Sequence, residues 1–537
     1  MDEDLRSIQQ AREFVRAASE AQKRFEHASQ ESVDKIVSAM ARAGAEAAEH
    51  LARLAHEETG FGRVDSKTMK NLFSTTTLVE RMEGMKTCGI IRRLDGNSIW
   101  EIATPMGVVA ALIPSTNPTS TALYKAIISA KARCGIVMSP HPRAASCTAE
   151  ALKTVAEGAY RAGAPRGLFA CMTEVTLAGT NELLENEGTD VILATGGTPM
   201  VRAAYSKGKP AYGVGSGNVP VYVDRSADVE KAAADLIYGA SFDWGTLCST
   251  ERSVVADLPI RGKLIERMKA EGAYFATESE AQKLRSFVVQ RGRLNVEQVG
   301  KPPAWIAAMA GFSVPESTLA LIAEVTEVGK QEPLSMETLS PVLSFYSEDG
   351  WEKGCERCIE ILEFGGIGHT LGLHCTNQRV IEAFALEKPA MRIVVNTVAA
   401  LGSVGYTNGL FPSMTLGPGT IGGSITSDNI SPMHLLNIKR LAFETKPVTS
   451  RAAGTKSKRA STAGGSTKSR PASWIDEIDA RLRQRAGNPP TPRTPRSQPQ
   501  TPADTSAERS ADRESPARSS GGLSEERIAD LVARFGK

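Results

Sequence analysis

Short apolar runs alternate with helical stretches through the middle of the chain. The runs that predict buried strands cover residues 108–114, 135–139, 191–194 and 220–223. The stretches that predict helices between them cover residues 124–133, 145–162 and 200–206. This alternation is typical of parallel βαβ units, so we expect an α/β fold with a doubly wound sheet.

The two ends of the chain have different compositions. Residues 1–85 are rich in Ala, Glu, Arg and Gln and predict helices, and a second mixed block covers residues 253–442. Residues 449–472 carry six basic and no acidic residues, and residues 488–522 are rich in Pro, Ser, Thr and Arg. Neither of the last two segments can bury enough apolar surface to offset its ordering entropy, so we expect disorder there.

Two short amphipathic helices are expected within this tail. In residues 473–486, Ser473 can cap the helix and one face carries Ile475, Ile478 and Leu482. In residues 523–537, Ser524 is the cap and the apolar stripe consists of Leu523, Ile528, Leu531, Val532 and Phe535. An isolated helix of this length is marginal in water. We therefore expect docking to another protein, with packing on the body or on a membrane surface as alternatives.

Composition excludes several functional classes. The net charge of +2 provides no basic field for nucleic acid, and residues 451–470 predict a solvated linker rather than a specific nucleic-acid site. No run approaches the roughly 18 apolar residues of a membrane span, and the N-terminus carries no signal pattern. Eight scattered cysteines favour reduced thiols in a cytosolic setting.

One cysteine stands out as a candidate nucleophile. Cys248 follows Gly245 and Thr246, after a helical run and before a strand-like run. The other seven cysteines are expected to be inert core residues. Cys355 and Cys358 have a spacing that fits one face of a helix, and without a second ligand pair nearby we expect no metal there.

Several further segments surround this cysteine in a recognisable order. They are 113–119 with Thr116 and Asn117, 139–142 with Ser139, His141 and Pro142, 194–201 with Thr195, Gly196 and Gly197, and 337–342 with Glu337 and Pro341. Together with Cys248 they resemble the aldehyde dehydrogenase superfamily over roughly residues 5–440. The resemblance implies a thiolate attack on an aldehyde, hydride transfer to NAD, and a thioester on Cys248.

Roles for these residues follow from the chemistry and the resemblance. Attack by a thiolate creates an alkoxide, which the side-chain amide of Asn117 and the backbone N–H of Cys248 can stabilise; the alternative for Asn117 is a turn residue. The resemblance assigns NAD binding to Thr116, Ser139, His141, Pro142, Thr195, Gly196, Gly197, Glu337 and Pro341. An ordinary loop histidine and a solvated surface charge remain the alternatives for His141 and Glu337.

A departure from the superfamily pattern concerns how the thioester is discharged. Hydrolytic members carry a water-activating Glu where this chain aligns Val214, in the segment 213–220. Valine has no proton chemistry, so transfer to coenzyme A is expected in place of hydrolysis. The segment 213–220 and the Gly-His-Thr at 368–370, with His374 beyond it, resemble the CoA-acylating branch. We take Val214, Gly215 and His369 as candidates for the CoA or acyl pocket, and His369 as a thiol base, a pocket wall or a structural residue.

The C-terminal tail indicates where in the cell the protein is expected to act. An acylating enzyme with tethered helices resembles the propionaldehyde dehydrogenases of bacterial microcompartments, which implies a location in the microcompartment lumen and binding to shell or cargo proteins. Phe242, Trp244 and Leu247 predict a small apolar pocket for a C2 or C3 aldehyde, with propanal favoured. Alternatives are an acetaldehyde-specific enzyme, a hydrolytic dehydrogenase, a semialdehyde or acyl-phosphate reductase, and a non-catalytic scaffold.

The resemblance also implies a domain plan. We expect an NAD-binding domain at 1–240 with part of an oligomerisation arm near 90–105, a catalytic domain at 241–425, and a returning arm segment at 426–448. A linker at 449–522 with the helix at 473–486 would precede the docking helix at 523–537. Homo-oligomers assembled through the small β arm are implied as well.

Overall fold

The computed structural model describes residues 2–446. The helices expected at 473–486 and 523–537, and the linker expected around them, lie outside the described residues. Within residues 2–446 the strands form one five-stranded, one seven-stranded, one three-stranded and one two-stranded sheet.

The five-stranded sheet is parallel throughout, with strand order β5-β4-β3-β6-β7. Its strands are β3 (Val108–Ile113), β4 (Gly135–Pro140), β5 (Phe169–Cys171), β6 (Val191–Thr195) and β7 (Ala211–Val214). The predicted strands at 108–114, 135–139 and 191–194 are confirmed. Neighbouring residues of β3 enter different apolar clusters, Val109 and Ala111 on one face and Val108 and Ala110 on the other, so both faces are buried.

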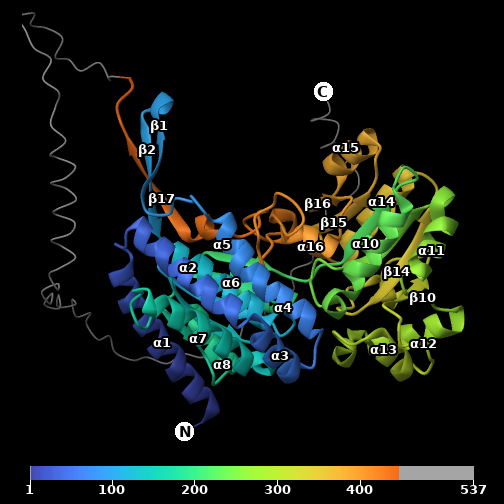
Figure 1. Cartoon of the computed structure of the whole chain (residues 1–537), viewed down its shortest axis with the longest axis horizontal. Coiled ribbons are helices and arrows are strands. Elements are labelled where there is room, and N and C mark those ends of the chain that lie inside the picture. The colour runs from blue at the N-terminus through green and yellow to red at the C-terminus, as the bar shows by residue number, and fades with distance from the viewer. Residues whose placement is uncertain (1, 447–537) are drawn as a thin grey trace, which may run out of the picture. The chain divides into compact units, whose positions relative to one another are not determined.

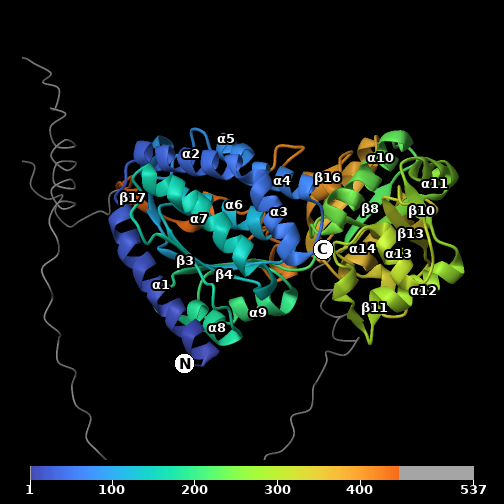
Figure 2. The ribbon, with the colours of Figure 1, turned by 60° about the horizontal axis from the view of Figure 1, so that its bottom comes forward.

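Helices cover both faces of this sheet (Figure 2). One face packs against α2 (Gln30–Glu46), α6 (Pro118–Lys131) and α7 (Ala145–Arg161), and the other against α1 (Glu3–Phe25), α8 (Leu177–Glu185) and α9 (Thr198–Tyr205). The remaining N-terminal helices are α3 (Ala48–Thr59), α4 (Val64–Leu72) and α5 (Leu78–Arg81). Helix α6 begins earlier than the predicted residue 124, because Pro118 occupies the first helical position, where its missing N–H costs nothing.

The seven-stranded sheet is also parallel, with order β10-β13-β14-β9-β8-β15-β16. Its strands are β8 (Val219–Val223), β9 (Glu251–Asp257), β10 (Ala273–Phe275), β13 (Ala320–Glu324), β14 (Val342–Glu348), β15 (Gly368–His374) and β16 (Ala390–Val395). The helices around it are α10 (Val229–Ser241), α11 (Arg261–Ala270), α12 (Glu278–Val288), α13 (Pro303–Ala310), α14 (Trp351–Phe364), α15 (Gln378–Glu387) and α16 (Ala399–Ser403). A small hairpin pairs β11 (Val289–Gln290) with β12 (Arg293–Leu294).

The change from one sheet to the other falls between β7 and β8. Strand β8 pairs with β9 and β15, so β8 and α10 belong with the second sheet, whereas the sequence placed them before the boundary at 240. The alternation of strands and helices shows that a strand exists and is buried. It does not show which of two parallel sheets the strand joins.

A separate antiparallel ribbon stands apart from the two large sheets (Figure 1). It consists of β1 (Gly89–Leu94), β2 (Ile99–Pro105) and β17 (Leu436–Ala442). Strand β17 pairs along the whole of β2, from Leu436 opposite Pro105 to Ala442 opposite Ile99. The segments expected near 90–105 and 426–448 therefore come together, and their role in oligomerisation stays a prediction.

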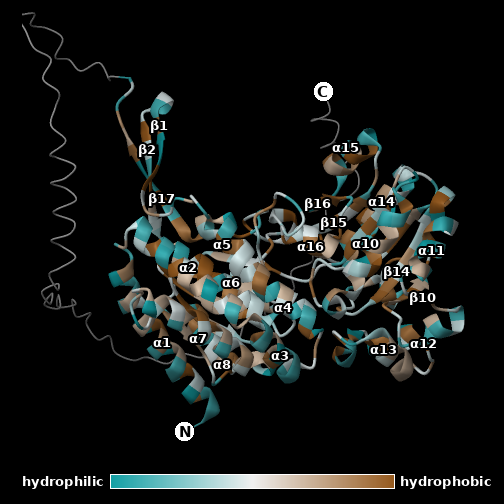
Figure 3. Cartoon of the chain, in the orientation of Figure 1, coloured by the Kyte–Doolittle hydropathy of each residue, from teal (hydrophilic) through white to brown (hydrophobic). Residues whose placement is uncertain are grey.

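Hydropathy follows this arrangement. The strands are mainly brown and the outward faces of helices such as α11 are teal in Figure 3, as expected where strands are covered on both faces. Cys355 and Cys358 are both buried on α14, as the spacing predicted. Within residues 2–446, no helix combines the length and the apolar character needed to cross a bilayer.

Candidate functional site

The predicted cofactor segments meet at the carboxyl edge of the five-stranded sheet. Ile113, the last residue of β3, lies opposite Pro140 of β4, and the backbone N–H of His141 donates to its carbonyl oxygen at 2.9 Å. Thr195 at the end of β6 lies opposite Val214 at the end of β7. The turns after these strands therefore open on the same side, which is where open parallel sheets bind ligands.

Cys248 lies on a constrained turn between α10 and β9. The residues before it, Asp243, Trp244 and Gly245, have φ angles of 49°, 48° and 72° in succession. This left-handed backbone is unfavourable for the two residues that carry a Cβ, and it persists only where its surroundings hold it. At Gly245 a Cβ would lie 2.8 Å from the carbonyl oxygen of Ser340, so only glycine fits.

A buried carboxylate holds this turn in place. Asp243 accepts hydrogen bonds from the Arg63 backbone N–H at 2.7 Å, from Thr246 Oγ1 at 2.5 Å and from Lys67 Nζ at 3.1 Å, and it also pairs with Lys70. Burial acts to raise the pKa of Asp243, but the two lysines more than offset this and lower it below its usual value. The strained turn is thus tied to helix α4 by charge-assisted hydrogen bonds.

The side chain of Asn117 lies against the same turn. Its Nδ2 donates to the carbonyl oxygen of Thr246 at 3.2 Å and to Thr116 Oγ1 at 3.1 Å, and its Oδ1 accepts from Lys70. Asn117 is 9% exposed and directly precedes α6. The amide predicted to stabilise an oxyanion is therefore held beside the turn that carries the predicted nucleophile.

The electrostatic surroundings of Cys248 keep its thiol protonated in this state. Burial raises the pKa of Cys248 to about 12 and the carboxylate of Glu337 adds to the rise, while Arg392 and the backbone N–H of Cys248 oppose it. A thiol is the weak form of this nucleophile, so reaction requires an event that removes the proton.

Glu337 faces the nucleophile region rather than solvent. Its Oε1 accepts from the backbone N–H of Gly217 at 3.0 Å. Burial raises the pKa of Glu337 to about 7, although Arg252 works against the rise. Because the carboxyl group of Glu337 is half-buried and hydrogen-bonded, the alternative of a solvated surface charge for this residue is disfavoured.

The two histidines of the motif at 368–374 lie far apart in the structure. His369 is near the start of β15 and His374 at its end, about 16 Å apart at the usual rise of a strand. His369 lies near the nucleophile turn, and Gly217 lies between them. A Cβ added to Gly217 would be 3.3 Å from Cγ of His369 and 2.1 Å from the carbonyl oxygen of Cys248. Burial and Arg392 lower the pKa of His369 to about 3, so the ring is neutral near pH 7 and a poor base.

The turn after β6 fits a nicotinamide cofactor. A Cβ at Gly196 would meet no atom within 4 Å, so the backbone is open to a ligand there. Helix α9 starts after Gly197 without a side-chain cap, which leaves its first N–H groups available to a pyrophosphate. After β4, His141 and Pro142 are exposed. The hydroxyl of Ser139 is hydrogen-bonded to Thr180 Oγ1 at 2.9 Å. The hydroxyl of Thr195 is hydrogen-bonded to Thr415 Oγ1 at 3.0 Å. The residues present fit the group, although Ser139 and Thr195 already have partners.

Val214 lies in an apolar environment. It is 1% exposed and belongs to the same buried cluster as Phe242 and Leu247, next to Cys248 in the chain. Gly215 follows it at the start of the segment that leads to β8. A charged carboxylate would be costly at this position unless it were paired.

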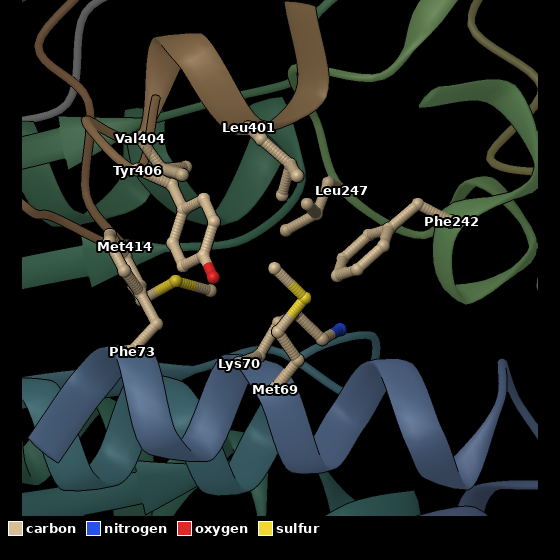
Figure 4. Close-up of a pocket in the computed structure, with 9 residues that line it drawn as sticks. All are labelled: Met69, Lys70, Phe73, Phe242, Leu247, Leu401, Val404, Tyr406 and Met414. Atoms are coloured by element: carbon tan, nitrogen blue, oxygen red, sulfur yellow. The ribbon is translucent and has the colours of Figure 1, made fainter. Parts of the chain in front are cut away.

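An apolar pocket adjoins the nucleophile turn (Figure 4). Its cavity volume is about 10 Å³, roughly room for one water molecule. It is lined by Met69, Lys70, Phe73, Phe242, Leu247, Leu401, Val404, Tyr406 and Met414. Phe242 and Leu247 were predicted as pocket residues. Trp244 is not in this lining; its ring lies under the guanidinium of Arg63, 5.1 Å from the ring centroid.

Sequence patterns missed the charged residues that support the site. Lys67 and Lys70 are three residues apart on α4 and so share a face, yet the segment read only as polar and helical. Arg252 is buried and donates to the carbonyl oxygen of Ser340 at 2.7 Å, and Arg392 to that of Gly417 at 2.7 Å. The spacing of the lysines was a usable signal, but their partner Asp243 lies too far along the chain to be paired with them from sequence.

Comparison with known proteins agrees with this geometry. Residues 5–283 match the model of the aldehyde dehydrogenase family. The chain belongs to the aldehyde dehydrogenase family. Among solved structures, an acetylating aldehyde dehydrogenase from Geobacillus thermoglucosidasius is 51% identical, with a TM-score of 0.83 over 84% of this chain and 100% of that one.

Two curated relatives differ in how much of their length is matched. The succinate-semialdehyde dehydrogenase (acetylating) of Clostridium kluyveri is 35% identical over 81% of this chain and 96% of its own. An aldehyde-alcohol dehydrogenase of Clostridium acetobutylicum is 40% identical over 81% of this chain but only 51% of its own. The chain thus spans about half the length of the aldehyde-alcohol dehydrogenases it matches.

A structure with bound ligand bears on the chemistry of this fold. A propionaldehyde dehydrogenase from Rhodopseudomonas palustris, with bound CoA and an acylated cysteine, is 27% identical with a TM-score of 0.73 over 81% of this chain and 97% of that one.

Proposed function

We propose that the protein oxidises a short aldehyde with NAD+ and passes the acyl group to coenzyme A. The main support for the proposal is that the nucleophile turn has a hydrogen-bond donor beside it but no carboxylate at the position that activates water in hydrolytic members. A hydrogen-bond donor, Asn117, lies beside the turn that bears Cys248, whereas Val214 lies in an apolar cluster where hydrolytic members have a carboxylate. Relatives described as acetylating, and a fold relative with an acylated cysteine and CoA, support it.

The reaction proceeds in two balanced halves. In the first, Cys248 Sγ loses its proton to solvent water and bonds to the aldehyde carbon, and the carbonyl electron pair moves to oxygen. The amide N–H of Asn117 and the backbone N–H of Cys248 stabilise that oxyanion. The nicotinamide supplies the hydride acceptor when bound. Loss of the hydride from carbon leaves a thioester on Cys248.

In the second half the thiol of CoA loses its proton to solvent and its thiolate attacks the thioester carbon. Cys248 leaves as a thiolate and takes a proton from solvent, so one proton is released per turnover. His369 lies near the Cys248 turn beside Gly217 and is neutral near pH 7, so its ring adds no charge to this region. Gly217 lets its backbone pack directly against the nucleophile turn, because a Cβ there would lie 2.1 Å from the Cys248 carbonyl oxygen.

We infer that the residues lining the apolar pocket next to the nucleophile turn select the aldehyde. The pocket lining is mostly aliphatic and aromatic and contains no arginine, and the single lysine in it is bound to Asp243 and Asn117. An aldehyde with an anionic tail would be desolvated there without a partner. We therefore favour an uncharged C2 or C3 aldehyde, with propanal preferred and acetaldehyde as the second candidate; one methylene changes binding by only about 1–3 kcal/mol.

Assembly and location are part of the proposal. We infer that β1, β2 and β17 form the arm of a homo-oligomer, since the ribbon exposes Ile90, Leu441 and Phe443. A propionaldehyde dehydrogenase from the Clostridium phytofermentans fucose utilisation microcompartment, 30% identical with a TM-score of 0.72, supports placing this chain in such a compartment. Removal of residues 521–537 is expected to leave catalysis intact and to disperse the protein in cells. Continued co-purification of the truncated protein with shells would assign targeting elsewhere.

Intact-protein mass spectrometry tests the chemistry directly. Incubation with propanal and NAD+ but without CoA is expected to add one propionyl group to Cys248, and added CoA to remove it within the time of a turnover. The Cys248→Ser variant is the control and should remain unmodified and inactive. An unmodified wild-type protein that still forms NADH would contradict the covalent route, and absence of NADH altogether would favour a non-catalytic scaffold.

A further inference from the structure

A buried lysine closes a ring of hydrogen bonds around the nucleophile turn. Lys70 donates both to Asn117 Oδ1 and to Asp243 Oδ2. Asp243 Oδ2 in turn accepts from Thr246 Oγ1 at 2.5 Å, and the carbonyl oxygen of Thr246 accepts from Asn117 Nδ2 at 3.2 Å. These four residues therefore connect helix α4, the start of α6 and the turn that bears Cys248.

The ring determines which end of the Asn117 amide faces the nucleophile. An ammonium group only donates, so Lys70 must contact the amide oxygen. The NH₂ group then faces the Thr246 carbonyl oxygen. A flip of the amide would set two donors against each other at Lys70 and two oxygens against each other at Thr246.

A neighbouring lysine shares the charge of Asp243 but not the amide. Lys67 lies three residues earlier on α4, is 2% exposed, and donates to Asp243 Oδ2 at 3.1 Å and to the Thr116 carbonyl oxygen at 3.1 Å. Lys70 is similarly buried at 4%. Neutralisation of Asp243 is thus common to both lysines, whereas contact with the Asn117 side chain belongs to Lys70.

We propose that Lys70 is a positioning residue for hydride transfer, which fixes the Asn117 amide so that its NH₂ group, and not its oxygen, faces the turn that bears Cys248. The inference rests on the proposed function, because it takes Asn117 as the oxyanion donor. Lys70 acts through Asn117: it lines the apolar pocket, but its Nζ is bonded to Asn117 and Asp243.

A double-mutant cycle tests this role. The rate of the NADH burst without CoA is measured for Lys70→Met and for Lys67→Met, each in the wild-type and in the Asn117→Ala background, along with melting temperature and NAD+ affinity. Both variants leave Asp243 with one lysine, so similar falls in melting temperature are expected. Lys70→Met should slow the burst at least tenfold more than Lys67→Met, at similar NAD+ affinity, and should add less than twofold once Asn117 is absent.

Equal burst rates for the two lysine variants, or an undiminished effect of Lys70→Met in the Asn117→Ala background, would overturn the inference. Lys70→Gln covers the case in which Lys70→Met does not fold, since its amide can still donate to Asn117 Oδ1. It should restore the burst to within about threefold of wild type; a burst as slow as that of Asn117→Ala would also overturn the inference.

The burst rate of Asn117→Ala separates a wrong oxyanion assignment from a wrong role for Lys70. If Asn117→Ala alone leaves the burst unchanged, the oxyanion assignment in the proposed function is wrong and the inference falls with it. If Asn117→Ala slows the burst about 100-fold while Lys70→Met matches Lys67→Met, only the role of Lys70 is wrong.

Discussion

Asn117 Nδ2 donates to the carbonyl oxygen of Thr246 at 3.2 Å, two residues before Cys248. Through this bond the loop that follows β3 of the five-stranded sheet holds the turn that precedes β9 of the seven-stranded sheet. The candidate oxyanion donor and the candidate nucleophile are thus fixed relative to each other, although 131 positions separate residues 117 and 248 in the sequence (248 − 117).

Replacement of this donor should impair chemistry more than binding. Asn117→Ala is expected to lower kcat by about 100- to 1000-fold, because the alkoxide loses a positioned hydrogen bond. Steady-state kinetics should show KM for NAD+ changing by less than a factor of three. A large rise in KM at constant kcat would mean that Asn117 binds the ground state instead.

The reactivity of Cys248 should increase steadily with pH in the cofactor-free protein. Its pKa is raised to about 12 by burial and by Glu337, so the thiolate fraction grows about tenfold per pH unit between pH 7 and 9. The rate of iodoacetamide labelling at Cys248, followed by peptide mass spectrometry, measures this fraction. Glu337→Gln should speed labelling at pH 8, because it removes a nearby negative charge. A plateau below pH 9, or no effect of Glu337→Gln, would show that another group activates the thiol.

The open backbone at Gly196 provides a test of cofactor binding. A Cβ there meets no atom of the protein within 4 Å, so Gly196→Ala should leave the melting temperature unchanged. It should raise KM for NAD+ about tenfold if a pyrophosphate approaches this backbone. Gly262→Ala on α11, where a Cβ is equally unobstructed, is the matched control: it should leave KM for NAD+ unchanged, and its melting temperature should not fall, because Ala is the better helix former. An unchanged KM in Gly196→Ala would move the cofactor away from this turn.

Much of the fold could be predicted from local pattern. Buried parallel strands such as β3, β4 and β6 are continuous apolar runs bounded by turn residues, and these are visible one segment at a time. The choice of sheet for β8 depends on pairing with β15, a strand that comes more than a hundred positions later, and no local pattern contains that information.

The candidate site, too, could be predicted only where the information lies in a local segment of the sequence. Cys248, Asn117 and the glycines after β6 are sequence-based predictions, made because their proposed chemistry needs particular residue types in recognisable segments. The ring of Lys70, Asp243 and Thr246 was not predicted, because its members come from α4 and from a turn with two left-handed non-glycine residues. Such strained positions break local rules and tend to mark functional sites.

Acid should destabilise the protein in part through His369. Its pKa is lowered to about 3 in the folded state, against about 6.5 when unfolded, so below pH 6.5 the unfolded chain binds a proton that the folded chain does not. Stability is therefore lost as pH falls from 6.5 towards 3, at about 1.4 kcal/mol per pH unit for this group. Thermal unfolding at pH 7 and pH 5 should show a smaller acid loss for His369→Asn than for wild type. An equal loss in both proteins would contradict a buried neutral imidazole.

Product analysis distinguishes acyl transfer to CoA from hydrolysis. Purified protein is incubated with propanal and NAD+, with and without CoA, and NADH, propionyl-CoA and propionate are quantified. Because Val214 provides no carboxylate to activate water, we expect one propionyl-CoA per NADH with CoA, and at most a single stoichiometric burst of NADH without it. Sustained formation of propionate and NADH in the absence of CoA would contradict it.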